Sequence, residues 1–425
     1  MVDTGVEALH PDLKDNLNLD LSWNYLNQTK DPTPTGAHGT SCAGIIAARG
    51  WNNEGVRGVA PFTQLVGLNP FSTGYDNDFQ DALARPYVDI SSNSWGPSSW
   101  SLEPFGDLEY IEQGIETGRG GKGIVYVFAA GNDGFNANAS SNVHSSRYTI
   151  TVAAVDAVGG KTTYSNYGSN ILISAPGGEI PNIMTTYLPG SDEYPSIKNY
   201  ADNTDGNYTD DFDGTSSAAP MVSGVAALML QANRNLTYRD VKYIIATTAR
   251  KTDLTHSGWT NSIGVTSVHE FNPYYGFGVI NADAAVKKAK GFTTLSEEIE
   301  IKTEKSEYIA LTDVGTEAFS MDINDSIAIE HVDLQLMLAH TNIGDIEIEL
   351  ESPRGTISKL AFCRDISGYF YCTGDWKYYS YSGYKFGSVR HLDENSVGTW
   401  KLRIKDLRSN SWGTLSHWSL QIFGH

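Results

Sequence analysis

The sequence predicts an α/β domain built on a parallel sheet, followed by an all-β sandwich. In the first part, short apolar runs such as Ile124–Ala130 and Tyr148–Ala154 indicate buried strands. They alternate with stretches of helical spacing, an order that favours a parallel sheet covered on both faces. From about Leu295 onward the pattern is strand-like to the end of the chain, which is typical of a sandwich.

The individual elements follow from their periodicity. Helical spacing runs through Ser217–Asn233 and Thr237–Thr247, and the last clear helix is Ala282–Lys290. Beyond it, Ile346–Leu350 and Trp400–Ile404 alternate apolar and polar residues, the pattern of half-exposed strands. We therefore expect one domain over residues 1–292 and a β-sandwich over 296–425.

The chain starts in an unusual way. Val2–Gly5 has the pattern of the end of a buried strand, and that strand has no residues before it. No basic and then apolar leader follows Met1. We expect a mature or truncated chain whose first strand is cut short and whose targeting segments lie upstream.

Composition excludes several classes of function. The 425 residues carry 30 basic and 50 acidic side chains, a formal net charge of −20. This balance argues against nucleic-acid partners and anionic membrane surfaces, and it fits either a solubilising surface or oxygen ligands for calcium. The longest apolar runs, such as Gly224–Leu230, are too short to span a membrane.

Three cysteines permit at most one intramolecular disulfide. Cys363 and Cys372 lie nine residues apart in a loop-like segment and could pair in an oxidising compartment. Cys42 lies in an apolar helical run, which favours a small buried side chain.

The segment Gly214–Met221 (GTSSAAPM) contains a candidate nucleophile. Ser216 follows Gly-Thr and precedes a helical run of small residues, so its hydroxyl and its backbone N–H belong at a helix N-terminus. That position can stabilise a developing oxyanion. A plain helix cap is the alternative for this serine taken alone.

Two further segments supply a candidate base and a group to orient it. His38 enters a helix of small residues in Gly36–Gly44 (GAHGTSCAG), and Asp3 ends the first apolar segment in Val2–Gly5. Carboxyl ends of parallel strands gather catalytic groups. An aspartate there can fix the tautomer of a histidine. A structural histidine and a turn-capping aspartate are the respective alternatives.

Asn132 closes a strand in Ala129–Asp133 (AAGND) and offers an amide as a second oxyanion donor. The four candidates occur in the order Asp, His, Asn, Ser, and with this set the chain resembles the subtilases. Ser94–Pro97 (SWGP) and Ser174–Gly177 (SAPG) extend the resemblance, which covers residues 1 to about 290. The resemblance implies a serine endopeptidase in which Ser94, Trp95 and Gly96 pair with the substrate backbone.

The second part is similar to the P domain of kexin and proprotein-convertase relatives. The residues that carry this likeness are His340–Leu350, Ser352–Thr356 and Trp418–Gly424. The resemblance implies a jelly-roll-like sandwich that packs against the catalytic domain and is needed for its folding. It also implies a secreted or periplasmic protein that acts on proteins or peptides and meets a propeptide or an inhibitor.

Kexin-like enzymes cut after paired basic residues because carboxylates line their cleft. Most of these acidic positions are replaced here, by Thr4, by Gly36-Ala37, within Phe135–Asn142 and by Asn166. Only Asp78, with Glu103 as a further candidate, lies near an acidic subsite position. An arginine needs a partner when it is desolvated, so we expect cleavage broader than strict dibasic cutting.

Calcium is the cofactor that the resemblance implies. The expected ligands are the carboxylate of Asp12, the side chain of Asn53 and the carbonyls of Trp51, Val56 and Gly58. Hard oxygen ligands of these kinds suit Ca²⁺. A second site near Asn24 and Asp31 is a weaker hypothesis, and a solvated turn ending at Pro32 is its alternative.

Two readings of a different class stay open at this point. One is an inactive binding module that keeps the subtilase fold, which a poorly anchored Asp3 would favour. The other gives the sandwich its own sugar or matrix target, because aromatic residues are dense at Tyr369–Tyr371 and Tyr378–Tyr381. Strand cores are also rich in aromatic residues, so the second reading has an ordinary structural alternative.

Overall fold

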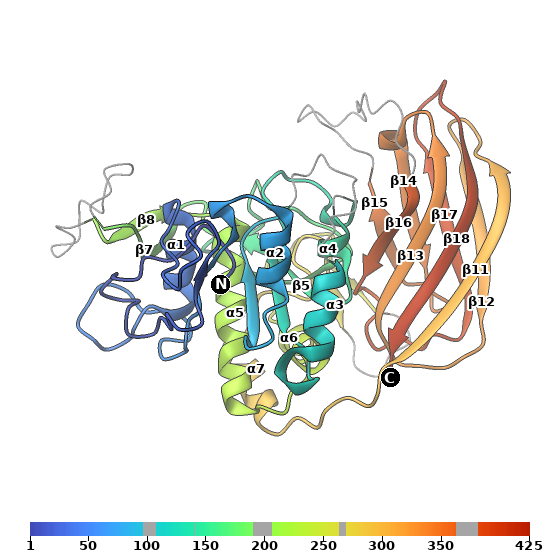
Figure 1. Cartoon of the computed structure of the whole chain (residues 1–425). Helices are drawn as coiled ribbons and strands as arrows, with labels where there is room; N and C mark the ends of the chain where they lie inside the picture. Colours follow the sequence, from blue (N-terminus) through green and yellow to red (C-terminus); the bar gives the residue numbers. More distant parts are fainter. Residues whose placement is uncertain (97–107, 140, 190–205, 263–268, 363–380) are drawn as a thin grey trace.

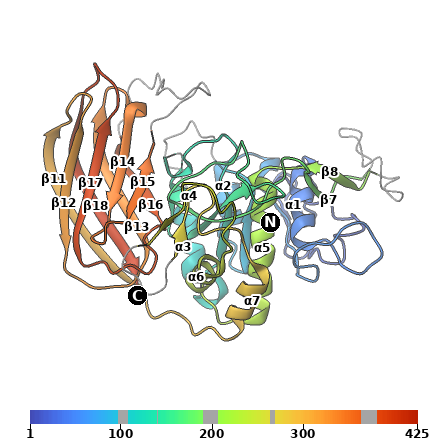
Figure 2. The same ribbon diagram turned by 180° about the vertical axis from the view of Figure 1, so that it is seen from behind.

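The computed structural model describes the chain except residues 97–107, 140, 190–205, 263–268 and 363–380. An α/β part and a β-sandwich lie side by side, as Figure 1 and the reverse view in Figure 2 both show. In the part of the chain so described, no helix is both long enough and apolar enough to cross a membrane.

A four-stranded parallel sheet forms the centre of the α/β part, in the order β3-β4-β5-β6. Val2 makes parallel bridges to Asn93 at the end of β3 and to Leu68 in β2, and it therefore lies between these two segments. This places Asp3 at the carboxyl edge of the sheet. The strands are β3 (Ile90–Asn93), β4 (Val125–Ala129), β5 (Thr149–Val155), β6 (Ile171–Pro176) and the short β2 (Leu68–Asn69).

Helices cover both faces of the sheet, as its continuous apolar strands predict. On β4, Val125, Val127 and Ala129 pack in one core with residues of α5, α6 and α7, whereas Tyr126 and Phe128 pack in another with residues of α2 and α3. Figure 1 shows α5 running along the sheet. The helices are α2 (Asp76–Leu83), α3 (Leu108–Thr117), α5 (Thr215–Ala232), α6 (Tyr238–Thr248) and α7 (Ala282–Lys290).

Helix α1 (Ala37–Ala47) packs against α5 and against the hairpin strand β7 (Ile183–Thr186). Its side chains are small and almost all buried, which allows this close approach. The remaining short elements of the α/β part are β1 (Trp23–Asn24), η1 (Pro70–Ser72), η2 (Gly118–Gly120), η3 (Ala137–Ala139), α4 (Asn142–Ser145), β8 (Tyr208–Phe212), β9 (Thr260–Asn261) and β10 (Glu270–Phe271).

The C-terminal part is a sandwich of two four-stranded antiparallel sheets, ordered β11-β18-β13-β16 and β12-β17-β14-β15. Its core is rich in aliphatic side chains and contains the fully buried Trp400 and Trp418. The predicted fold class, a parallel α/β domain followed by an all-β sandwich, is confirmed. The strands are β11 (Ile299–Ala310), β12 (Thr316–Ile323), β13 (Ile329–His340), β14 (Ile346–Glu351), β15 (Ile357–Ala361), β16 (Tyr381–Ser388), β17 (Gly398–Asp406) and β18 (Gly413–Gly424), with the 3-10 turn η4 (Ile343–Asp345) before β14.

The sandwich contacts the α/β part through polar groups that are buried or half-buried. Asn138 donates from Nδ2 to the Gly387 carbonyl of β16 (2.7 Å) and accepts the Gly387 N–H at Oδ1 (2.9 Å). Arg239 of α6 donates from Nε to Glu330 of β13 at 3.0 Å. These hydrogen bonds cross between the two parts, and in a separated α/β part or sandwich the same groups would bond to water instead.

Candidate active site

Asp3 lies at the carboxyl edge of the parallel sheet and is 1% exposed. Its backbone N–H donates to the Leu68 carbonyl (3.1 Å), and the Val2 N–H donates to the Ser92 carbonyl (3.1 Å). The segment is therefore anchored on both sides, which removes the structural reason for expecting a poorly held carboxylate. Asp3 Oδ1 also accepts the Thr4 N–H at 2.7 Å.

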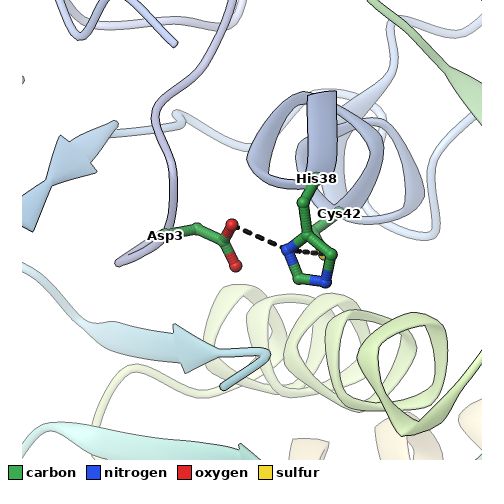
Figure 3. A group of neighbouring side chains, drawn as sticks. All are labelled: Asp3, His38 and Cys42. Carbon is green, nitrogen blue, oxygen red and sulfur yellow. Dashed lines mark hydrogen bonds and ion pairs between the residues drawn. The ribbon is translucent and has the colours of Figure 1, made fainter. Parts of the chain in front are cut away.

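His38 lies in the first turn of α1 and meets Asp3 directly. Its Nδ1 is 2.8 Å from Asp3 Oδ1 (Figure 3), so Nδ1–H donates to the carboxylate and Nε2 is left as the free ring nitrogen. The His38 side chain remains 37% exposed. Gly39 is required here, since a Cβ at that position would lie 2.2 Å from the Gly5 carbonyl oxygen.

Three effects set the pKa of His38. Burial lowers it, while the neighbouring Cys42 and the carboxylate of Asp3 raise it, and the net result is a raised pKa. Cys42 can contribute only as a thiolate, and burial raises the pKa of Cys42. The partner that raises the His38 pKa around neutral pH is therefore Asp3.

Ser216 occupies the first turn of α5, as expected for a helix N-terminus. The turn begins after Gly214, whose φ of +90° favours glycine. Pro220, four residues after Ser216, has no N–H to bond the Ser216 carbonyl. That carbonyl instead accepts from Ser94 Oγ (2.9 Å) and Cys42 Sγ (3.3 Å).

The contact of Cys42 with Ser216 brings the helix that carries His38 against the first turn of α5. Cys42 is one turn after His38 on α1, so the two side chains share a face of that helix. Because Cys42 reaches the Ser216 carbonyl, this face of α1 lies against the first turn of α5. In this structure the Ser216 hydroxyl donates to the Ser94 carbonyl at 3.2 Å, and it makes no hydrogen bond to His38, both residues being described.

Asn132 follows β4 and is held against the same turn. Its Oδ1 accepts from the Thr215 N–H (2.9 Å) and the Thr215 hydroxyl (2.8 Å). Two donors on Oδ1 fix which way the amide faces, and they leave Nδ2 to donate elsewhere. Nδ2 lies beside Gly214, where an added Cβ would approach it to 3.0 Å.

The predicted substrate strand Ser94-Trp95-Gly96 directly follows β3. Ser94 is 5% exposed and bonds the Ser216 carbonyl, and Trp95 Nε1 donates to the Val2 carbonyl at 2.8 Å. The rings of Phe71 and Phe79 lie 6.0 and 5.1 Å from that of Trp95. The Trp95 side chain therefore packs among aromatic rings, and the strand is held by hydrogen bonds to Val2 and Ser216.

Of the two predicted acidic subsite residues, the structure describes Asp78. Asp78 lies in the first turn of α2, and its carboxylate accepts the hydroxyl of Thr73. Glu103 lies outside the described residues, as do Cys363 and Cys372. Cys42 is a free thiol with no exposed surface, as predicted.

The predicted calcium ligand Asp12 is fully buried beside the loop of residues 51–58. Its Oδ2 accepts the Val56 N–H (2.9 Å) and its Oδ1 accepts from the amide of Asn52 (2.6 Å). The amide that reaches Asp12 is thus that of Asn52 rather than the predicted Asn53. Asn53 adopts a φ of +60° next to it.

The Asp12 site fits a cation in part. The hydrogen bonds described for the Asp12 carboxylate come from neutral donors, the Val56 N–H and the Asn52 amide, and a buried carboxylate without a cation is costly. The Asn52 amide presents an oxygen when it is turned over, whereas the Val56 N–H would have to give way to a metal. Carbonyls of Trp51, Val56 and Gly58 belong to the same loop.

The weaker second calcium hypothesis has less support. Asn24 uses its Oδ1 to accept the N–H groups of Leu26 and Asn27, and its Nδ2 donates to the Thr33 carbonyl. Asp31 is exposed. This arrangement favours the solvated turn.

Sequence reasoning missed three residues that shape the site. Thr215 orients Asn132, Cys42 joins α1 to α5, and Asn166 bonds the loop that carries Asn132. Thr215 could have been found, because it adjoins Ser216. Asn166 gave no such signal beyond the loss of an acidic residue at that position.

Comparisons with known proteins agree with this architecture. Residues 1–278 match the subtilase family, and residues 329–422 match the proprotein convertase P-domain. Human proprotein convertase subtilisin/kexin type 6 is 31% identical over 100% of this chain and 44% of its own length. Mouse furin is 30% identical over 100% of this chain and 53% of its own length. The chain thus spans about half the length of these curated relatives.

A solved structure resembles the whole chain. The serine protease of Aeromonas sobria aligns with a TM-score of 0.87 and 26% identity, covering 100% of this chain and 88% of that one. The same protease crystallised in complex with its chaperone gives a TM-score of 0.87. The chain belongs to the subtilase family, and its α/β domain is followed by a P-domain.

Proposed function

We propose that this chain is a serine endopeptidase in which Ser216 attacks the peptide carbonyl. The observation that carries the proposal is the meeting of the Asp3–His38 pair with the first turn of α5. The proposal requires that rotation about the Ser216 Cα–Cβ bond turn Oγ from the Ser94 carbonyl towards Nε2 of His38. Catalytic hydrogen bonds are often loose without substrate and tighten in the complex.

Each group then has a defined task. His38 takes the Ser216 proton at Nε2 and later returns it to the leaving amine, while Asp3 holds the ring and stabilises the imidazolium. The oxyanion of the tetrahedral intermediate would accept from the Ser216 N–H and from Asn132 Nδ2. The α5 dipole favours negative charge at that place.

The proposed substrates are proteins and peptides, with cleavage broader than strict dibasic cutting. A basic side chain at a desolvated subsite needs a carboxylate partner, and Thr4, Gly36-Ala37 and Asn166 stand where the resemblance implies acidic residues. A mixed peptide library tests this proposal, with the Ser216→Ala protein as the blank. We expect products without a uniform Lys-Arg or Arg-Arg before the cut. If nearly every cut followed such a pair, other carboxylates would have to enter the cleft, Glu103 first.

A calcium ion is part of the proposal as a structural cofactor. Asp12, Asn52 and the carbonyls of the 51–58 loop would hold it, and its charge would compensate the buried carboxylate. Binding only to the native state stabilises that state by mass action, so excess chelator should lower the melting temperature. Chelator should not lower the melting temperature of Asp12→Asn. An unchanged melting temperature of the parent in excess chelator would contradict a structural calcium ion.

We place the protein outside the cytoplasm, secreted or periplasmic, in line with the resemblance. A propeptide or an inhibitor is the proposed regulator. One structurally similar protein, the serine protease of Aeromonas sobria, has been crystallised in complex with a chaperone.

A further inference from the structure

One buried side chain bonds the backbone on both sides of Asn132. Asn166, in the loop before β6, is 3% exposed. Its Oδ1 accepts the N–H groups of Asp133 (3.1 Å) and Phe135 (2.9 Å), and its Nδ2 donates to the Ala130 carbonyl (2.9 Å). A single carboxamide thus joins the residues before and after the proposed oxyanion donor.

The contact leaves little freedom for the loop. The Asn166 backbone N–H donates to the Gly131 carbonyl at 2.9 Å. Gly131 has a φ of +100°, and a Cβ there would lie 2.4 Å from Asn166 Nδ2. The amide therefore rests directly on the backbone that leads into Asn132.

Only a neutral amide of this length meets both requirements. Oδ1 must accept two N–H groups while Nδ2 donates to a carbonyl. An ionised aspartate keeps the acceptor but has no donor, and its charge would face the Ala130 carbonyl oxygen. The chemistry of the position, and not its burial alone, calls for asparagine.

We infer that Asn166 is a positioning residue for the oxyanion site, acting through Asn132. Thr215 fixes the direction of the Asn132 amide, and Asn166 fixes the backbone from which that amide projects. Oxyanion donors work only when they are held within a fraction of an ångström of the place where charge develops. This inference rests on the proposed function, because it presumes that Asn132 donates to the oxyanion.

A double-mutant cycle in the full chain separates this role from general structural support. Asn166→Asp should lower kcat about 10- to 100-fold with little change in KM, the cost of a slightly displaced catalytic group. Asn132→Ala should lower kcat about 10²- to 10³-fold. In the Asn132→Ala background, Asn166→Asp should cost almost nothing further, since the group it positions is gone.

Asn170 offers a matched control on the same segment. It is buried, and its Nδ2 donates to the His144 carbonyl at 2.9 Å, away from the 130–135 loop. Asn170→Asp should lower thermal stability without the kcat effect. If Asn166→Asp fails to fold, Asn166→Ser, which is neutral and can still accept or donate one bond, replaces it in the cycle.

The outcomes differ clearly. An unchanged kcat in the folded Asn166 variant, or an equal loss in both backgrounds, overturns the positioning role while leaving the proposed activity intact. An unchanged kcat in Asn132→Ala alone overturns the oxyanion assignment itself, and the positioning role with it. We expect Asn166→Asp to lower kcat when Asn132 is present and to have almost no effect on kcat in the Asn132→Ala background.

Discussion

A group of a serine, a histidine and a carboxylate in the α/β domain can be compared with a buried group of the same residue types in the sandwich. In the α/β domain, His38 Nδ1 is 2.8 Å from Asp3, while the Ser216 hydroxyl donates to the Ser94 carbonyl. In the sandwich, Ser358 Oγ is 3.0 Å from His391 Nε2, and His391 Nδ1 is 3.6 Å from Glu394. By the serine–histidine distance alone, the second group has the better triad geometry.

Their surroundings separate the two groups. Ser358, His391 and Glu394 are at most 1% exposed. The Trp400 ring packs against His391 at an interplanar angle of 76°, with ring centroids 5.1 Å apart. The Ser358 hydroxyl is also shared with Ser388 at 2.6 Å. No substrate carbonyl can reach this serine in the folded protein, whereas His38 is partly exposed beside a helix N-terminus and a fixed amide. The residue set alone does not define an active site; access and oxyanion donors do.

The largest expected effect comes from removing the two serine hydroxyls in turn. Ser216→Ala should keep the fold and lower kcat by about 10⁴- to 10⁶-fold, because it removes the nucleophile. Ser358→Ala is the matched control and should keep the parental kcat, at a modest cost in stability. Peptide hydrolysis by both purified variants checks this prediction. Equal activity of Ser216→Ala and the parent would contradict the assignment of Ser216 as the nucleophile.

The acid partner of His38 should affect both rate and pH dependence. Asp3→Asn should lower kcat by about 10⁴-fold, since the wrong tautomer of His38 is then favoured. The carboxylate raises the His38 pKa, so its loss should also shift the acid limb of kcat/KM to lower pH. A pH profile with an unshifted or upward-shifted limb would contradict this role for Asp3.

The same pair links stability to pH. The folded pKa of His38 lies above its ordinary value of 6.5. The pair therefore contributes stability that is fully present below about pH 6.5 and is lost as pH rises through the folded pKa. Unfolding measurements on the parent and on Asp3→Asn should differ most at acidic pH and converge as pH rises.

The buried group should show the opposite pattern, with a smaller effect that falls on stability. Burial raises the pKa of Glu394. His391, Thr356 and Ser352 lower that pKa by more than burial raises it, so the pKa of Glu394 lies below its ordinary value. This stability is present above the ordinary glutamate pKa and is lost as pH falls through the lowered value. Glu394→Gln should cost about 1–3 kcal/mol of unfolding free energy at neutral pH and leave kcat of the folded protein unchanged. Chemical denaturation at pH 7 and pH 4 measures the predicted loss of stability. A lowered kcat in folded Glu394→Gln would contradict a purely structural role for this group.

Much of the fold was predictable because its signals are local. Ile124–Ala130 and Tyr148–Ala154 became β4 and β5, since continuous apolar runs suit strands buried on both faces. The helix expected over Ser217–Asn233 is α5, which begins two residues earlier, at Thr215. Helix ends depend on capping contacts and are less predictable than the apolar pattern.

The site was predictable only in part, for a physical reason. Ser216, His38 and Asp3 lie at strand ends and helix starts, where the sequence pattern points. The freed carbonyl of Ser216 could also have been found, because Pro220 is four residues later. Asn166 and Asn52 act through contacts between loops, whose partners no periodicity reveals. The burial of Ser358 also could not be predicted from the sequence, because it depends on contacts between distant segments.

Covalent labelling of the native protein tests the central claim most directly. A fluorophosphonate reacts with a serine that is accessible, activated by a base and backed by an oxyanion site, and peptide mapping by mass spectrometry then locates the adduct. We predict one adduct per chain, on the peptide that contains Ser216, with no adduct at Ser358 and none after denaturation. An adduct on another serine, or native protein that stays unlabelled, would contradict the assignment of Ser216 as the nucleophile.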